Sequence, residues 1–341
     1  MPQEAATNID PTPLLRTHDG LITHQALCAV AKLGVADFIG EGQRSAPEIA
    51  RELKVNEGAL CRTLRLLASQ GIFEEAAPHN FRNTDLSLLL RTGVPGSVRP
   101  LFIFWGSEFS YRCYGELVYC IQTGKPSWCK LSGMDDFEYL RHNPELARVF
   151  DDAMTNVSEL AGPAIAAAYN FGVYGSLMDV GGGSGILLSH ILRAHPTLRG
   201  VLADQAHVLA GARDRGFLSG DLETRTTMAE CDFFKEIPTG CRAYLMKSVI
   251  HDWNDDQSRT ILLNCRKSIP KDGALILVEF VLSGLNLPSP GKYLDLVMLV
   301  STEGRERTVD EFRELLGKAD FRLDRVIPTA AGVAIIEARP M

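Results

Sequence analysis

Hydrophobic residues in the first part of the chain recur at intervals of three and four, the spacing of one buried face of an α-helix. The pattern runs from His24 to Phe38 and predicts one continuous amphipathic helix over that range. Gly40 and Gly42 follow it, and glycine commonly ends a helix because it adopts conformations that other residues avoid. We therefore expect the helix to end before Gly40.

Two further helix starts are marked by residues that cap helices. Ser45 and Glu48 have the spacing of a capping box, which predicts a short helix to about Leu53. Asn56 can cap a third helix, whose leucines repeat along one face and which Gly71 would end. The first part of the chain is therefore expected to contain three helices in succession.

A β-hairpin is expected next, with strands over residues 72–75 and 81–83. Three helices followed by a hairpin are typical of a winged-helix domain, which often binds DNA. However, residues 1–100 carry 10 basic and 11 acidic residues, and residues 45–92 carry six of each. A surface that binds DNA needs a basic excess. The favoured interpretation is therefore a packing or dimerisation domain, with a DNA-binding regulator as the alternative.

The segment from residue 97 to about residue 170 has a helical pattern and is rich in aromatic residues. Most of these side chains are expected in the core, and a few could line an apolar pocket for a flat ligand. The aromatic residues are Phe102, Phe104, Trp105, Phe109, Tyr111, Tyr114, Tyr119, Trp128, Phe137, Tyr139 and Phe150.

From about Tyr174 short apolar runs alternate with helical segments, which predicts an α/β fold with a doubly wound sheet. The expected strands are Leu177–Val180, Leu198–Ala203, Thr224–Met228, Ala243–Met246, Leu275–Glu279, Leu323–Pro328 and Val333–Glu337.

A glycine-rich turn follows the first of these strands, at Gly181–Gly185. Glycines let a backbone approach a ligand closely, and such a turn lies at the sheet edge where ligands bind. The spacing does not match the dinucleotide fingerprint, and no Walker lysine follows. The turn therefore suits a nucleotide-like ligand that lacks a pyrophosphate.

Acidic residues follow the next two strands. Asp204 ends the second strand, 19 residues after Gly185, where a carboxylate can accept hydrogen bonds from both ribose hydroxyls. Asp232 follows the third strand and could accept from an adenine amino group, while Phe233 packs on the ring. An exposed turn aspartate and a core phenylalanine are the alternatives for this pair.

The fourth strand leads to His251, which is a candidate general base because histidine titrates near neutral pH. Asp252 is a plausible partner for the ring, and Trp253 would lie at the mouth of a pocket. Glu279 ends the apolar fifth strand, where a carboxylate is costly unless it is paired or functional. Glu306 lies between arginines just before a helix, so a helix-capping role competes with a catalytic one.

Composition excludes several other classes of protein. The 341 residues are 45% hydrophobic and 23% charged, with a net charge of −7, which argues against general binding to polyanions. No C-x-x-C or H-x-x-x-H spacing suggests a metal site, so we expect reduced thiols in a cytoplasmic protein and no metal. No apolar stretch is long enough for a membrane span, and residues 1–10 show no secretory signal pattern.

In their order along the chain, these motifs resemble those of the class I S-adenosylmethionine-dependent O-methyltransferases. The most similar group is the caffeic acid, flavonoid and acetylserotonin type, with its bacterial natural-product relatives. The resemblance covers nearly the whole chain. Its matching stretches are Asp179–Gly185, Asp232–Phe234, Lys247 with His251–Trp253, Asn264–Arg266, Asp295–Leu299 and Gly304–Thr308.

The resemblance implies three regions and a homodimer. Residues 1–100 would form a winged-helix dimerisation domain, and residues 101–170 a helical linker that contributes to the substrate pocket. Residues 171–341 would form a Rossmann-like catalytic domain that binds S-adenosylmethionine. Neither nucleic acid nor a membrane is expected as a partner.

The resemblance also implies roles for individual residues. His251 would be the base, with Glu279 and Glu306 beside it, one or both orienting the imidazole. The cofactor would be held by Asp179, Gly181, Gly182, Gly183, Asp204, Asp232, Phe233, Lys247 and Trp253. The substrate pocket would include Trp105, Phe150, Met154, Asp252, Met298 and Thr302, of which the two methionines match positions that clamp an aromatic acceptor.

Some features leave alternatives open. Cys231 stands where the family usually has glycine, and Gln205 with Ala206 where it has Leu-Pro. Relatives on this scaffold also methylate nitrogen or carbon, and some keep the cofactor but act as hydroxylases or pericyclic catalysts. Because His251, Glu279 and Glu306 are all present, transfer of a methyl group to a hydroxyl of a small aromatic acceptor is the favoured hypothesis.

Overall fold

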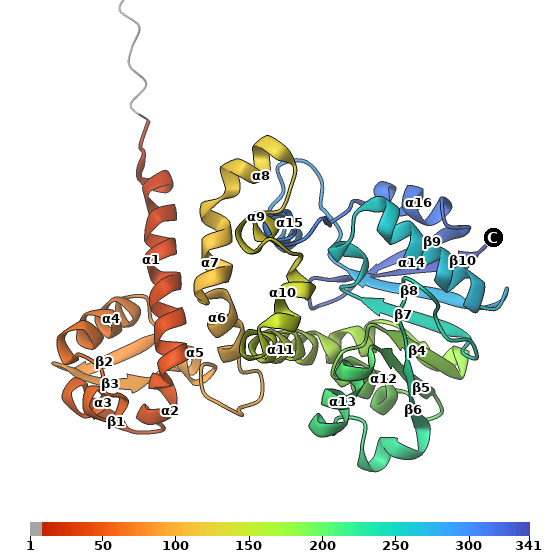
Figure 1. Cartoon of the computed structure of the whole chain (residues 1–341). Coiled ribbons are helices and arrows are strands. Elements are labelled where there is room, and N and C mark those ends of the chain that lie inside the picture. Colours follow the sequence, from red (N-terminus) through yellow and green to blue (C-terminus); the bar gives the residue numbers. More distant parts are fainter. Residues whose placement is uncertain (1–8) are drawn as a thin grey trace, which may run out of the picture. The chain divides into compact units, whose positions relative to one another are not determined.

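The computed structural model describes residues 9–341. Residues 1–8, which belong to the stretch analysed above for a secretory signal, lie outside the described part. The chain divides into two compact units, Met1–Glu108 and Phe109–Met341, which are described separately. Figure 1 labels the helices and strands of both units.

The first unit has helices packed on a small antiparallel sheet with strand order β1-β3-β2. The predicted helices with the Ser45–Glu48 capping box and the Asn56 cap are both present. Its elements are α1 (Thr12–Leu33), α2 (Val35–Ile39), β1 (Gln43–Ser45), α3 (Ala46–Leu53), α4 (Glu57–Ser69), β2 (Phe73–Ala77), β3 (Asn80–Asn83), α5 (Asp85–Leu88) and α6 (Arg99–Trp105).

The single helix predicted over residues 24–38 is wrong, because the chain forms two helices there. Gly34 has a φ of 71° and a ψ of 31°, a left-handed conformation that ends α1 and precedes α2. Its backbone N–H points back to the carbonyl groups of Val30 and Ala31, which caps the helix. The helical spacing continues through Gly34, so the sequence pattern did not reveal the break.

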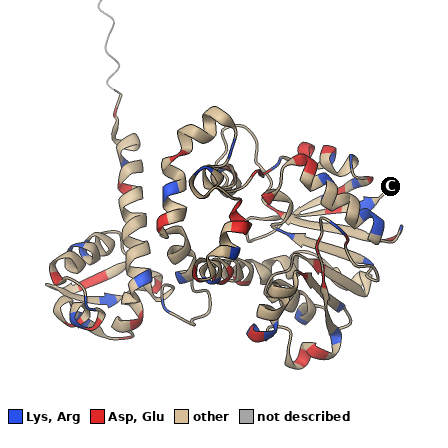
Figure 2. Ribbon diagram, in the orientation of Figure 1, with Lys and Arg blue, Asp and Glu red and all other residues tan. Residues whose placement is uncertain are grey.

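The core of the first unit is formed by side chains from α2, α3, α4 and the hairpin, including Ile39, Ile49, Leu64 and Phe81, all of them buried. Figure 2 shows acidic and basic residues mixed over these elements. The mixture agrees with the balanced charge of the sequence, and DNA binding by this unit stays the less favoured interpretation.

Short helices and one long helix begin the second unit. Their aromatic side chains mostly pack on one another: the ring centroids of Phe109 and Tyr139 lie 4.3 Å apart, and Trp128 meets both rings edge-on. Much of the aromatic content therefore forms a core, as expected. The helices are α7 (Glu108–Gly115), α8 (Leu117–Thr123), α9 (Ser127–Ser132), α10 (Asp136–His142) and α11 (Pro144–Ala168).

A seven-stranded sheet with the order β6-β5-β4-β7-β8-β10-β9 forms the centre of the second unit. Neighbours from β6 to β8 are parallel, whereas β10 pairs antiparallel with β8 and β9. The strands are β4 (Ser176–Val180), β5 (Arg199–Asp204), β6 (Thr226–Glu230), β7 (Ala243–Lys247), β8 (Ala274–Glu279), β9 (Phe321–Pro328) and β10 (Ala334–Pro340).

Helices cover this sheet and apolar side chains fill both of its faces, which confirms the α/β expectation. All residues of β8 are buried, as in a parallel strand covered on both sides. No helix in the described residues combines the length and apolar character that crossing a bilayer requires. The main helices are α12 (Ile186–Ala194), α13 (Ala206–Arg215), α14 (Asp255–Ser268), α15 (Pro290–Ser301) and α16 (Val309–Gly317).

The parallel strands end at one edge of the sheet, and that edge carries the chemistry expected from the sequence. The glycine turn follows β4, Asp204 ends β5, and Glu279 ends β8. His251 lies in a short 3-10 turn, Ile250–Asp252, shortly after β7. Because β4, β7 and β8 are adjacent, side chains that are far apart in the sequence meet at this edge.

Candidate active site

His251 is buried, and its ring is held by a carboxylate from a distant part of the chain. Its Nδ1 atom lies 2.7 Å from Oε1 of Glu306, a residue in the loop before α16. Glu306 is itself only 2% exposed, and its backbone N–H donates to Asp295 on α15. A carboxylate at this distance fixes a proton on Nδ1, which leaves Nε2 as the nitrogen able to accept a proton.

Glu279 holds the backbone beside the histidine rather than the ring. Its Oε1 atom accepts from the N–H groups of Val249, at 3.2 Å, and Ile250, at 3.0 Å. Its Oε2 atom is 3.9 Å from Nδ1 of His251 and has no hydrogen-bond partner among the described residues. Of the two glutamates expected beside the base, Glu306 makes the hydrogen bond to the imidazole.

Asp252 lies on the other side of the ring, with Oδ1 3.4 Å from Nε2 of His251. Burial on its own lowers the pKa of His251, but Asp252, Glu279 and Glu306 outweigh burial and raise that pKa to about 10. Burial raises the pKa of Glu279 to about 7 and that of Asp252 to about 6. The imidazole is thus a stronger base than a free histidine, and its protonated form is stabilised by the three carboxyl groups.

The glycine turn after β4 has the backbone conformation that the sequence suggested. Gly181 and Gly183 have φ values of 69° and 58°, which side chains disfavour. The N–H of Gly183 donates to Oδ2 of Asp204 at 2.9 Å. A Cβ atom at Gly182 would lie 2.7 Å from the carboxylate of Asp179, so the turn packs directly on that acid.

Asp179 is fully buried beneath the turn, and its Oδ2 atom lacks a hydrogen-bond partner within residues 9–341. Burial, followed by the charge of Asp204, raises its pKa to about 7. A buried, incompletely bonded carboxylate under a glycine turn is suited to a ligand that brings positive charge or hydrogen-bond donors. These residues therefore fit a cationic nucleoside cofactor.

The residues expected around the adenine lie at or after the ends of the parallel strands, at the same edge of the sheet as the glycine turn. Asp232 is exposed, and its Oδ2 atom pairs with Nζ of Lys235 at 2.8 Å, as in an ordinary turn. Phe233 packs edge-on against Trp253 with ring centroids 6.1 Å apart. Burial lowers the pKa of Lys247, which ends β7, while the charges of Glu279, Asp179 and Asp252 act in the opposite direction.

The expected acceptor-pocket residues come from several elements. Met298 on α15 is buried and its carbonyl accepts from the N–H of Thr302 at 2.8 Å. Phe150 and Met154 are on α11, half-buried and 37% exposed respectively. Trp105 is in the first unit, where it contacts Phe102 with ring centroids 5.5 Å apart.

Sequence reasoning missed three features of this region. Phe137 stacks on Trp253 with ring centroids 5.6 Å apart, so α10 packs beside the histidine turn. Burial, followed by the charge of Asp252, raises the pKa of Asp136 to about 7. Arg307 is fully buried. The run of motif residues Gly304–Thr308 was the signal that could have pointed to Arg307. Phe137 was among the aromatic residues of its segment, but nothing in the sequence indicated its contact with Trp253 or the burial of Asp136.

The donor atoms of His251, Glu279 and Glu306 lie within 4.8 Å of one another, close enough to share a metal ion. In the structure, Nδ1 of His251 and Oε1 of Glu306 are engaged with each other. The expectation of a metal-free site stays a prediction.

Comparisons with known proteins match both parts of the chain. The profile of an O-methyltransferase dimerisation domain matches residues 15–93, and the profile of an O-methyltransferase domain matches residues 114–322. A phenazine O-methyltransferase from Lysobacter antibioticus is 40% identical over 328 residues, which are 96% of this chain and 96% of that protein.

Two solved structures are similar over nearly their whole length. Human N-acetylserotonin methyltransferase, in complex with S-adenosylmethionine, has a TM-score of 0.90 and 25% identity, covering 99% of each chain. An O-methyltransferase from neocarzinostatin biosynthesis, in complex with S-adenosylmethionine and 2-hydroxy-5-methyl naphthoic acid, has a TM-score of 0.82 and 31% identity. It covers 98% of this chain and 100% of its own.

Proposed function

The chain belongs to the S-adenosylmethionine-dependent O-methyltransferase family, and from this we propose that it methylates a hydroxyl group of a small, flat aromatic acceptor with His251 as general base. The observation that carries the proposal is the hydrogen bond between Nδ1 of His251 and Glu306 at 2.7 Å. It directs Nε2, the remaining ring nitrogen, to accept a proton.

The residues at the sheet edge would hold the cofactor. Gly181–Gly183 and the buried Asp179 would receive the amino-acid part, and Asp204 the ribose. Asp232, Phe233, Lys247 and Trp253 would surround the adenine. When bound, S-adenosylmethionine supplies an electrophilic methyl group on a sulfonium sulfur.

The protein's own contribution to the reaction is proton removal and positioning. A neutral phenol is a poor nucleophile, so Nε2 of His251 would take its proton during attack, which is worth about 10²- to 10⁴-fold in rate. Glu306 would keep the ring oriented and stabilise the imidazolium. Asp252 and Glu279 add negative charge nearby, which makes the proton transfer more favourable.

The acceptor would lie against Met298, Thr302 and Asp252 on one side and against Phe150 and Met154 of α11 on the other. We propose residues 1–100 as the dimerisation domain, residues 101–170 as the contributor of pocket residues, Trp105 included, and residues 171–341 as the catalytic domain. A homodimer in the cytoplasm fits the matched dimerisation profile and the eight free cysteines.

The similarity to a phenazine O-methyltransferase and to a structure that contains a naphthoic acid favours fused-ring acceptors. We would incubate the purified protein with S-adenosylmethionine and panels of hydroxylated phenazines and hydroxynaphthoic acids, and identify products by mass spectrometry. O-methylated product and an equal amount of S-adenosylhomocysteine are expected. Product without S-adenosylhomocysteine would favour a non-methylating reaction, and N-methylated product would overturn the hydroxyl assignment.

The base is tested with His251→Ala, and the exposed His142→Ala on α10 serves as a matched control. The His251 variant is expected to lose about 10²- to 10⁴-fold in kcat while it still binds S-adenosylmethionine, measured by calorimetry. The His142 variant should retain the wild-type rate. A wild-type rate in His251→Ala would show that another group removes the proton.

A further inference from the structure

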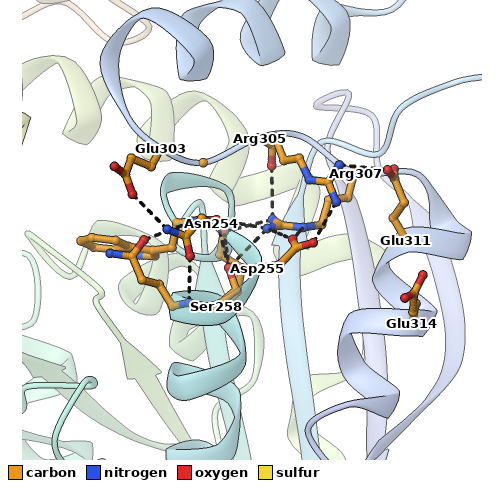
Figure 3. A network of polar contacts seen from close by, with 12 residues as sticks. Asn254, Asp255, Ser258, Glu303, Arg305, Arg307, Glu311 and Glu314 are labelled. Carbon is orange, nitrogen blue, oxygen red and sulfur yellow. Dashed lines mark hydrogen bonds and ion pairs between the residues drawn. The ribbon is translucent and has the colours of Figure 1, made fainter. Parts of the chain in front are cut away.

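Arg307 is a fully buried arginine whose guanidinium is surrounded by hydrogen-bond acceptors. It reaches Asp255, the first residue of α14, with Nη2 2.8 Å from Oδ1. Figure 3 shows this ion pair joining the loop before α16 to the start of α14. A buried arginine is costly unless it is paired and hydrogen-bonded, so the full set of partners indicates a specific task.

That task concerns the turn that carries the candidate base. Nη1 of Arg307 donates to the carbonyl of Ile250 at 3.1 Å, and Nη2 donates to the carbonyl of Trp253 at 3.0 Å. These two carbonyls lie on either side of the His251–Asp252 segment. The Oγ atom of Ser258 on α14 lies 3.2 and 3.1 Å from the same two carbonyl oxygens, so its single hydroxyl proton is shared between them. The backbone on both sides of His251 is therefore held by one arginine and one serine.

The loop that carries Arg307 also touches the turn directly. A Cβ atom at Gly304 would overlap the carbonyl oxygen of His251, so only glycine permits this approach. Glu306, which binds the ring of His251, lies between Gly304 and Arg307 in the sequence. Gly304, Glu306 and Arg307 of one short segment therefore all contact the turn that carries His251.

We infer that Arg307 is a positioning residue that keeps the imidazole of His251 aligned with Glu306 by holding the carbonyls of Ile250 and Trp253. The inference rests on the proposed function, because it concerns the same base. Without the guanidinium, both carbonyls keep only Ser258 as a side-chain donor, and the turn gains freedom to shift relative to Glu306. A displacement of about 1 Å in a catalytic group can cost about 100-fold in rate.

The test compares Arg307→Met and Arg307→Lys with Arg305→Met. Arg305 is a matched control because it also pairs with Asp255, at 3.0 Å, but in the described structure it donates to neither of the two carbonyls. Arg307→Met is expected to lose about 10- to 100-fold in kcat with less than about threefold change in KM for either substrate. Arg307→Lys should recover part of the loss, and Arg305→Met should match the wild type.

A double-mutant cycle with Glu306→Gln separates positioning from general stability. If Arg307 acts through the contact between His251 and Glu306, its removal should cost less than about threefold once Glu306 is already replaced. Equal losses in both backgrounds would overturn the inference. Should Arg307→Met fail to fold, Asp255→Asn replaces it in the double-mutant cycle. This substitution weakens the ion pair of the Arg307 guanidinium by changing a side chain that is about half exposed.

A second readout does not depend on finding the acceptor. In protein labelled with nitrogen-15 histidine, the Nδ1 proton of His251 should give a downfield signal that moves upfield in Glu306→Gln, because a neutral amide oxygen accepts a weaker hydrogen bond than a carboxylate. The inference requires this signal to weaken or shift in Arg307→Met and to persist in Arg305→Met. An unchanged signal in Arg307→Met would refute the inference even if no methyl transfer were found, whereas absent methyl transfer with the expected signals would refute only the proposed function.

Discussion

His251 and Glu306 are 55 residues apart in the sequence, yet Nδ1 of the histidine lies 2.7 Å from Oε1 of the glutamate. Two elements bring them together: the turn after β7 carries the ring, and the loop before α16 carries the carboxylate. The contact assigns different work to the two glutamates near the base, since Glu279 is engaged with backbone N–H groups at 3.0 and 3.2 Å.

Because Glu306 contacts the ring and Glu279 contacts the backbone, replacing each by glutamine is expected to lower kcat by different amounts. Glu306→Gln removes the charge that faces the ring, so kcat is expected to fall by about 10- to 100-fold. Glu279→Gln retains a carbonyl oxygen that can accept from Val249 and Ile250, so a loss of less than about tenfold is expected. Steady-state kinetics with a saturating acceptor measure both. A larger loss in Glu279→Gln would mean that Glu279, not Glu306, supports the base.

The raised pKa of His251 predicts that activity increases with pH. Because its pKa is raised to about 10 by Asp252, Glu279 and Glu306 against the effect of burial, most of the free enzyme carries a protonated ring at neutral pH. The acceptor kcat/KM should therefore rise with pH from neutrality and level off near that value. In Glu306→Gln the pKa should fall and the levelling should occur at lower pH.

Ionisation of the acceptor hydroxyl itself is a competing cause of such a rise. The residual rate of His251→Ala, measured over the same pH range, reports that contribution alone. If kcat/KM of the wild type is flat between neutral pH and about pH 9, or follows the profile of His251→Ala, the raised pKa does not govern catalysis.

The centre of the sheet could be predicted from the sequence because β4, β7 and β8 are short, mostly apolar runs bounded by turn residues. The predicted strand Leu275–Glu279, for example, forms within β8, Ala274–Glu279. The break at Gly34 could not be predicted, since the apolar spacing runs through it and only the backbone conformation reveals it. Local periodicity reports which face is buried, not where a helix changes direction.

The candidate site was predictable as a set of residues but not as a set of contacts. The ends of the predicted strands placed His251 and Glu279 near one sheet edge, and the family resemblance implied that Glu306 lies beside them. Neither showed which glutamate binds the ring. That answer depends on the path of the loop before α16, which is fixed by Arg307 and by the close approach of Gly304. Such long-range packing leaves no periodic signal in the sequence.

Metal removal is expected to leave activity unchanged. His251, Glu279 and Glu306 are close enough to share an ion, but a base that uses Nε2 needs Nδ1 bonded to Glu306. Dialysis against EDTA should therefore preserve the rate, and added Mg²⁺, Mn²⁺ or Zn²⁺ should not increase it. Loss of activity after EDTA that a specific metal restores would contradict the prediction of a metal-independent reaction.

Asp179 is predicted to lower the stability of the cofactor-free protein and to strengthen the binding of S-adenosylmethionine. Its pKa is raised from 3.8 to about 7, chiefly by burial, so ionisation costs folding free energy. The folded protein therefore loses stability as pH rises from about 4, the unfolded value, through about 7. Asp179→Asn removes this loss and should stabilise the cofactor-free protein by up to about 4 kcal/mol at pH 8, because one pKa unit corresponds to about 1.4 kcal/mol.

Thermal unfolding at several pH values, with and without S-adenosylmethionine, measures both parts of this prediction. The advantage of Asp179→Asn should grow from about pH 4 to about pH 8 and then stay nearly constant, because the wild-type carboxyl is almost fully ionised about one unit above its raised pKa. The same variant should bind the cofactor more weakly, since a neutral amide replaces the buried charge. The exposed Asp214→Asn on α13 is the control, and it should change neither property. Cofactor affinity equal to that of the wild type in Asp179→Asn would place the cofactor's positive charge away from this carboxylate.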